Sequence, residues 1–187
     1  MAKKKQKILL VIDVQNDFIT GALRNEEAIK KLPNIVKLLN TKEYDETYVT
    51  MDTHDEDYLN TLEGKKLPIK HCIKGTWGWQ MPGEVRATDA IQRAEVFEKP
   101  TFGSEWMVSH LAATHVGDEN TEPEYEFTIV GFCTDICVVS NALLLRAYFP
   151  NSTIKVVEDC MAGTSREAHD AAILVMGSCQ VDVVPNR

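Results

Sequence analysis

Short apolar runs alternate along this chain with segments that carry a helical pattern, and this alternation restricts the fold more than any other feature. Runs such as ILLVI and IKVVE are apolar at nearly every position, which is typical of parallel strands buried on both faces. The sequence therefore predicts a doubly wound, mostly parallel six-stranded α/β sheet with helices on both faces. We expect strands over residues 7–13, 47–51, 95–98, 126–131, 153–158 and 180–184. We expect helices over residues 26–40, 105–115, 135–148 and 164–176, the last opening with a capping-box pattern at Thr164.

The carboxyl ends of the predicted strands carry most of the residues able to do chemistry. In open α/β sheets, ligands bind beyond these ends. The first strand ends at Asp13, the second at Asp52 and His54, and the third at Lys99, and Cys133 and Cys137 follow the fourth. Residues 52–94 form a long stretch without clear periodicity, as functional loops often do. The sequence thus places a candidate site at one edge of the sheet.

Length and charge limit the class of protein. The 187 residues suffice for one core, so we expect one domain over residues 1–187. The net charge of -8 argues against nucleic-acid or anionic-membrane partners, and no apolar stretch is long enough to cross a bilayer. Five cysteines without an export signal favour reduced thiols and a cytoplasmic location.

Cys137 is the candidate nucleophile. Thr134 and Asp135 are good helix N-cap residues, so Cys137 falls in a first helical turn, where free amides and the helix dipole favour a thiolate. A buried cysteine that only packs under the turn fits this segment equally well. Asp13, able to move protons, and Lys99, able to stabilise a thiolate, favour the catalytic interpretation.

A second group of residues has the character of metal ligands. Asp52 and His54 alternate at the end of a strand, so both side chains can face one ion. Glu63 and His71 follow in the same loop. Mixed oxygen and nitrogen donors suit Zn²⁺, Fe²⁺ or Mn²⁺ better than Ca²⁺. The loop is acidic throughout, so a solvated Glu63 is the alternative.

Three blocks together resemble the signature of the isochorismatase-like cysteine hydrolases: Asp13-x-Gln15-x-Asp17-Phe18, Lys99-Pro-x-Phe102-x-Ser104, and Gly131-x-Cys133-Thr134-Asp135-x-Cys137-Val138. The resemblance covers nearly the whole chain. It implies a catalytic triad of Asp13, Lys99 and Cys137. It also implies a cis peptide between Phe132 and Cys133, with the amides of Cys133 and Cys137 as the oxyanion hole.

The loop after the second strand resembles the nicotinamidase branch, in which a metal binds the pyridine nitrogen of the substrate. The resemblance implies a divalent ion, zinc first and iron or manganese as alternatives, on Asp52, His54, His71 and Glu63. Glu63 would stand where some relatives have a further histidine. The implied substrate is a small heteroaromatic amide, as in NAD salvage, with Phe18 stacked on its ring. The further substrate-binding candidates are Gln15, Phe102 and Trp77.

Two other functions compete with this prediction. One is a metal-independent isochorismatase or carbamoyl-amide hydrolase, and the other is a non-catalytic zinc-binding protein on the same fold. The presence of metal separates the first from a nicotinamidase, and an intact triad argues against the second. Homo-oligomers are common in the family, although no surface patch in this sequence requires one.

Overall fold

A computed structural model of the chain describes residues 5–115 and 125–185. Its centre is a six-stranded sheet in the order β3-β2-β1-β4-β5-β6, with parallel pairing throughout. The predicted fold class is confirmed. The strands are β1 (Gln6–Ile12), β2 (Glu46–Asp52), β3 (Glu95–Lys99), β4 (Tyr125–Phe132), β5 (Thr153–Ala162) and β6 (Asp182–Val184).

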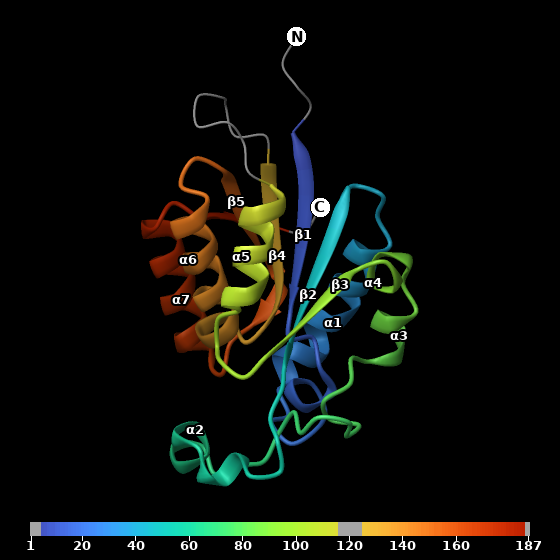
Figure 1. Cartoon of the computed structure of the whole chain (residues 1–187), viewed down its shortest axis with the longest axis vertical. Helices are drawn as coiled ribbons and strands as arrows, with labels where there is room; N and C mark the ends of the chain where they lie inside the picture. Colours follow the sequence, from blue (N-terminus) through green and yellow to red (C-terminus); the bar gives the residue numbers. More distant parts are fainter. Residues whose placement is uncertain (1–4, 116–124, 186–187) are drawn as a thin grey trace.

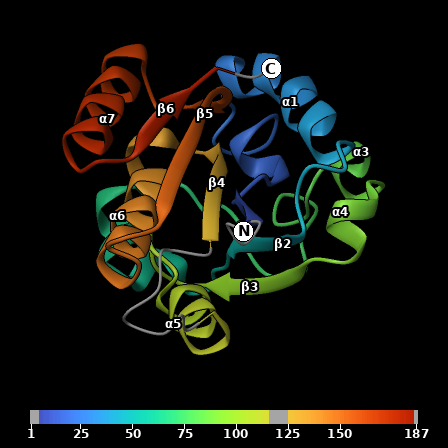
Figure 2. The ribbon, with the colours of Figure 1, turned by 90° about the horizontal axis from the view of Figure 1, so that it is seen from above.

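Helices cover both faces of the sheet (Figure 2). One face carries α1 (Glu26–Leu39), α3 (Gly83–Arg86) and α4 (Asp89–Gln92). The other carries α5 (Glu105–Thr114), α6 (Val139–Tyr148) and α7 (Arg166–Ser178). The alternation of β1 explains both layers: Leu9 and Val11 enter one core, and Ile8, Leu10 and Ile12 enter the other.

Local sequence signals account for the helix starts. The Asn25 side chain accepts hydrogen bonds from the amides of Glu27 and Ala28 at the start of α1. Ser165, rather than the expected Thr164, caps α7 by accepting from Ala168. Of the helices in the described ranges, none is long and apolar enough to cross a membrane.

The long segment after β2 is more ordered than its sequence suggested. It contains a 3-10 turn (Tyr58–Asn60), α2 (Leu62–Lys66), α3 and α4. These helices have four or five residues each, too few for a 3.6-residue period to be recognised. Figure 1 shows α2 beyond the carboxyl ends of the strands, at the edge of the sheet where the site was expected.

Candidate active site

A cavity of about 570 Å³ opens at the carboxyl edge of the sheet, beside α2. It collects residues that lie far apart in the sequence, from the ends of β1, β2 and β3 and from the turn after β4. The expected site residues in its wall are Phe18, Asp52, Glu63, His71, Phe102, Cys133 and Cys137, together with apolar side chains such as Leu23, Leu62 and Ile136. This is the volume range of small-molecule sites.

Asp13 lies buried at the exit of β1. Its backbone adopts φ 48°, a left-handed conformation that is uncommon outside glycine. The Thr50 hydroxyl donates a 2.7 Å hydrogen bond to Asp13 Oδ1, and Lys99 Nζ lies 2.6 Å from Oδ2. Both oxygens of the carboxylate are therefore held by β2 and β3.

Lys99 connects the Asp13 carboxylate to the cysteine. Its ammonium donates to the Thr101 carbonyl at 3.0 Å and to Cys137 Sγ at 3.5 Å, and it lies 3.6 Å from Asp52 Oδ1. Burial lowers the pKa of Lys99, but Asp13, Cys137 and Asp52 outweigh it and hold that pKa above its usual range. Lys99 therefore stays protonated, the form that can stabilise a thiolate.

The electrostatics around Cys137 correct one expectation. Burial raises the pKa of the thiol well above its usual value, and the neighbouring Asp13 carboxylate raises it further. Lys99 lowers it, without prevailing. The raised pKa favours a resting thiol that keeps its proton, because burial disfavours the charged thiolate. Burial also raises the pKa of Asp13, against the effect of Lys99, so Asp13 is a stronger base than an exposed aspartate.

The turn that carries Cys137 also differs in detail. The expected cis peptide between Phe132 and Cys133 is confirmed. The turn over Thr134–Val138 is a π-helix that leads into α6, and no side chain caps its start. Thr134, an expected cap, instead pairs through its hydroxyl with His169 Nδ1 at 2.8 Å. The other, Asp135, accepts bonds from Thr164. Single π turns often occur at functional sites.

Asp52, His54 and His71 form a cluster suited to a divalent metal. One ligand atom from each lies within 4.8 Å of the others. His71 Nδ1 pairs with the Ile69 carbonyl at 2.9 Å, which leaves Nε2 as the ligand atom. His54 Nε2 is buried without a hydrogen bond, although it lies 3.1 Å from Asp52 Oδ2. A metal ion would satisfy this orphaned nitrogen.

Glu63 lies at the edge of this cluster. Its Oε1 is 3.8 Å from Nε2 of both His54 and His71, on a partly exposed side chain. Burial and the charge of Asp52 raise the pKa of Glu63, whereas the two histidines and Lys99 hold the pKa of Asp52 well below its usual range despite burial. Asp52 is therefore the firmly anionic donor of the set.

Two of the expected substrate contacts do not line the cavity. The side chain of Gln15 is buried and bonded to the backbone: Oε1 accepts from the Asp52 amide at 2.8 Å, and Nε2 donates to the Asp52 and Trp79 carbonyls. Trp77 is 57% exposed and lies outside the cavity wall. Phe18 and Phe102 do line it, and the ring of Phe18 packs edge-on against His71 at 5.8 Å.

Asp17 supports the same loop and was not singled out by sequence reasoning. Its Oδ2 accepts from the amide of Cys72, directly after His71, at 2.7 Å, and its Oδ1 accepts from Ala22. Gly78 packs so closely that an added Cβ would lie 2.1 Å from Asp17 Oδ2. The available signal was that Gln15 and Asp17 stand two residues apart in one motif, but this spacing did not reveal that both hold the loop.

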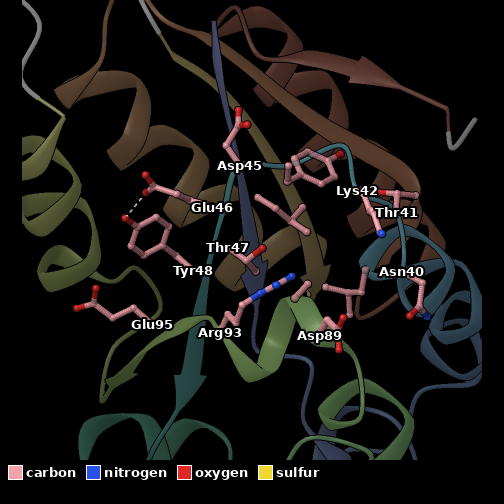
Figure 3. Close-up of a pocket in the computed structure, with 14 residues that line it drawn as sticks. Asn40, Thr41, Lys42, Asp45, Glu46, Thr47, Tyr48, Asp89, Arg93 and Glu95 are labelled. Carbon is pink, nitrogen blue, oxygen red and sulfur yellow. Dashed lines mark hydrogen bonds between the residues drawn. The ribbon is translucent and has the colours of Figure 1, made fainter.

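A larger cavity of about 760 Å³ lies at the other end of the sheet, around the amino ends of β2 and β3 (Figure 3). Lys42 and Arg93 line it together with Asp45, Asp89 and Glu95, and the Tyr48 hydroxyl donates to Glu46 at its rim. Side chains of both charges line this cavity, and none of the candidate catalytic or metal-binding residues does. The chemistry therefore concentrates in the smaller cavity.

The family model of the isochorismatase domain matches residues 7–186. The chain belongs to the isochorismatase family. An isochorismatase family protein, PncA of Bacillus subtilis, is 29% identical over 175 residues, covering 90% of this chain and 92% of the relative. The nicotinamidase of Saccharomyces cerevisiae is 25% identical over 174 residues, covering 73% of this chain and 80% of the relative. This isochorismatase family member is therefore a hydrolase.

Solved structures share the fold. The nicotinamidase PncA from Bacillus subtilis superposes with a TM-score of 0.76 at 26% identity, covering 96% of this chain and 99% of that one. A pyrazinamidase of Pyrococcus horikoshii in complex with zinc gives 0.76 at 22% identity, over 96% and 99% of the two chains. An N-carbamoylsarcosine amidase from Thermoplasma acidophilum gives 0.70 at 23%, over 97% and 96%. The last two, at 22% and 23% identity, are evidence for the fold only.

Proposed function

We propose that this isochorismatase family member is a nicotinamidase, which converts nicotinamide and water to nicotinate and ammonia. One observation carries the proposal: a buried Asp13–Lys99–Cys137 set and an Asp-His-His cluster lie at the same edge of the sheet, with Asp52 and Cys137 both lining one cavity. The first group is suited to amide cleavage, and the second is suited to hold a metal that would bind a ring nitrogen. The family relatives named as nicotinamidases support the same substrate.

The metal would be held by Asp52, His54 and His71, with Glu63 near enough to join or to bind through water. Nitrogen and carboxylate donors favour Zn²⁺, with Fe²⁺ and Mn²⁺ as alternatives. When bound, the ion supplies a Lewis-acid contact for the pyridine nitrogen, which orients the ring. Phe18 and Phe102 are the aromatic walls of the same cavity and would enclose the ring.

The reaction begins at the neutral thiol. Asp13 takes the proton of Cys137 as sulfur bonds to the amide carbon, and Lys99 stabilises the charge that passes between them. The amides of Cys133 and Cys137 are the proposed donors to the oxyanion. Asp13 then gives its proton to the nitrogen, the C–N bond breaks, and ammonia leaves a thioester.

Water completes the cycle. Asp13 removes a proton from water as the oxygen adds to the thioester carbon. The C–S bond breaks, the acid is released, and the sulfur recovers the proton from Asp13. One group thus serves as base and as acid in turn, which matches its raised pKa. Five free thiols fit a reducing compartment and so the expected cytoplasmic location.

The test compares ammonia release from nicotinamide and from benzamide, together with metal analysis of protein purified without chelator. We expect turnover of nicotinamide, weak turnover of benzamide, and bound metal. Cys137→Ala should abolish turnover, whereas Cys160→Ala, which alters an equally buried cysteine on β5, should not. Equal rates on both amides would remove the role of the metal. No turnover of pyridine carboxamides would favour a carbamoyl-amide hydrolase instead.

A further inference from the structure

Asn141 is a fully buried amide on α6, one turn after Cys137. Its Nδ2 donates to the Cys137 carbonyl at 2.8 Å and to the Phe102 carbonyl at 3.3 Å. Its Oδ1 accepts from the Ser104 amide at 2.9 Å. One side chain therefore joins the turn after β4 to the segment after β3.

The first of these bonds fixes the backbone of the nucleophile. In the π turn, Val138 donates to the Cys133 carbonyl and Val139 to the Thr134 carbonyl, five residues back. These bonds span five residues and so depart from the four-residue hydrogen-bond pattern of the α-helix that follows. The Asn141 amide gives the Cys137 carbonyl a buried donor at this junction, and so restrains the residue that carries the sulfur.

The other two bonds fix the segment over residues 100–104. Its Thr101 carbonyl accepts from the Lys99 ammonium, its Phe102 ring lines the cavity, and Ser104 caps α5 by accepting from Met107. Movement of this segment would displace a partner of Lys99 and a wall of the cavity together. Asn141 holds the segment by backbone atoms on both sides of Gly103.

Packing alone does not explain an amide at this position. Helices α5 and α6 already meet through a buried apolar cluster that includes Met107, Leu111, Ala142 and Leu145. A buried amide costs free energy unless every polar atom is paired, and an apolar side chain would avoid that cost. Within the part of the chain that the structure describes, the Asn141 amide is paired only to the two segments that form the site.

We propose that Asn141 is a positioning residue, which keeps the Cys137 sulfur in register with Lys99 and holds the Phe102 wall in place. The proposal rests on Cys137 as the nucleophile of the proposed function. The bond to Cys137 and the bonds to the Phe102 segment can be tested separately. The neighbouring Ser140 hydroxyl donates to the carbonyl one turn back, at 2.6 Å from Ile136 O, and a serine at position 141 could do the same. Asn141→Ser should keep the bond to Cys137 and lose the bonds to the Phe102 segment.

The experiment measures two quantities for each variant: the rate at which iodoacetamide alkylates the Cys137 peptide, and kcat and KM for nicotinamide. Asn141→Leu should lower kcat/KM by roughly 100-fold, the loss typical of a misplaced reacting group. It should also slow alkylation of Cys137. Both variants should have a KM above that of the wild type, because both lose the bonds to the Phe102 segment. Asn141→Ser should nevertheless recover the alkylation rate. Asn34→Leu is the control: Asn34 is a half-buried helical asparagine that also donates to a backbone carbonyl, that of Asp159, on the other face of the sheet.

Three results would overturn the proposal: unchanged alkylation and turnover in Asn141→Leu, equal losses in Asn34→Leu, or recovery of KM together with alkylation in Asn141→Ser. If Asn141→Leu fails to fold, the split between alkylation and KM in Asn141→Ser decides. If the wild type does not hydrolyse nicotinamide, the proposed substrate fails. The alkylation series, which needs no substrate, still decides the role of Asn141.

Discussion

Replacing Thr50 by valine should shift the acidic limb of the pH–activity profile without changing the shape of the profile. The Thr50 hydroxyl donates to Asp13 Oδ1 at 2.7 Å, and both side chains are fully buried. A hydrogen bond to a buried charged group contributes about 1.5–3 kcal/mol, which corresponds to about 1–2 pKa units. The bond stabilises the carboxylate, so its loss raises the pKa of Asp13, which burial has already raised.

The sign follows from the active form. Asp13 must begin the reaction as a carboxylate, so activity is lost as the pH falls through the pKa of Asp13. In Thr50→Val the acidic limb of kcat/KM should therefore move to higher pH by about 1–2 units. The measurement is ammonia release from nicotinamide across the pH range, with thermal unfolding at each pH to confirm folding.

Two variants isolate this effect. Thr50→Ser keeps the hydroxyl and should keep the acidic limb near its wild-type position. Thr128→Val also removes a buried hydroxyl, but that group pairs with the Tyr44 hydroxyl, and Thr128 lies opposite Leu9, four residues before Asp13 in the chain. It should lower stability without moving the limb. A Thr50→Val protein that folds and shows an unmoved limb would refute the role of Thr50 in holding Asp13.

Further predictions concern the groups around Asp13 and the metal cluster. Lys99→Met leaves the buried carboxylate without its cation and should cost about 3–5 kcal/mol of unfolding free energy and most of the activity, measured by denaturant titration and ammonia release. In this variant the pKa of Asp13 in the folded state lies still further above its unfolded value. The loss of unfolding free energy should therefore grow as the pH rises from 5 to 8, and a loss that does not depend on pH would contradict this reasoning. Gln15→Leu removes both bonds to the Asp52 backbone and should weaken metal binding by about 10–100-fold, measured by chelator competition, with unchanged affinity as the contrary result.

The sequence predicted the sheet well because its strands are buried on both faces and their apolar runs stand out. The main discrepancy is β5, which continues to Ala162, beyond the predicted end at residue 158. The pairing of β5 with β4 is interrupted by an irregularity after Ile129 and resumes with Gly131 opposite Met161. Gly131, with φ 125°, lies at this irregularity, and a glycine inside a strand is a signal for a bulge. That signal does not specify how far the partner strand continues, so the end of β5 was not predictable.

The candidate site was predictable where its residues belong to motifs. It was not predictable where the role of a residue depends on which way its side chain points. Lys99 ends a strand, Asp13 and Cys137 follow strands, and the three meet at one edge because parallel strands share that edge. Gln15 was expected in the cavity, yet the left-handed backbone of Asp13 interrupts the alternation of the strand and turns the Gln15 side chain to the Asp52 backbone. Asn141 lies within an ordinary helical pattern, so only the structure reveals its contacts.

Burial sets the chemistry of this site in a way that helix position alone would not. Cys137 and Asp13 each have a raised pKa, so the thiol holds its proton and the carboxylate accepts one readily. A permanently ionised cysteine would be a weaker nucleophile, since nucleophilicity falls with the pKa of the thiol. Moving the proton to Asp13 only as the sulfur attacks keeps the stronger nucleophile and stores the proton where ammonia needs it. Lys99 lowers the free-energy cost of that transfer, because its positive charge stabilises the negative charge on Asp13 before the transfer and on the sulfur after it. In this triad, one proton therefore moves between the buried Cys137 thiol and the buried Asp13 carboxylate, while the Lys99 cation stays in place.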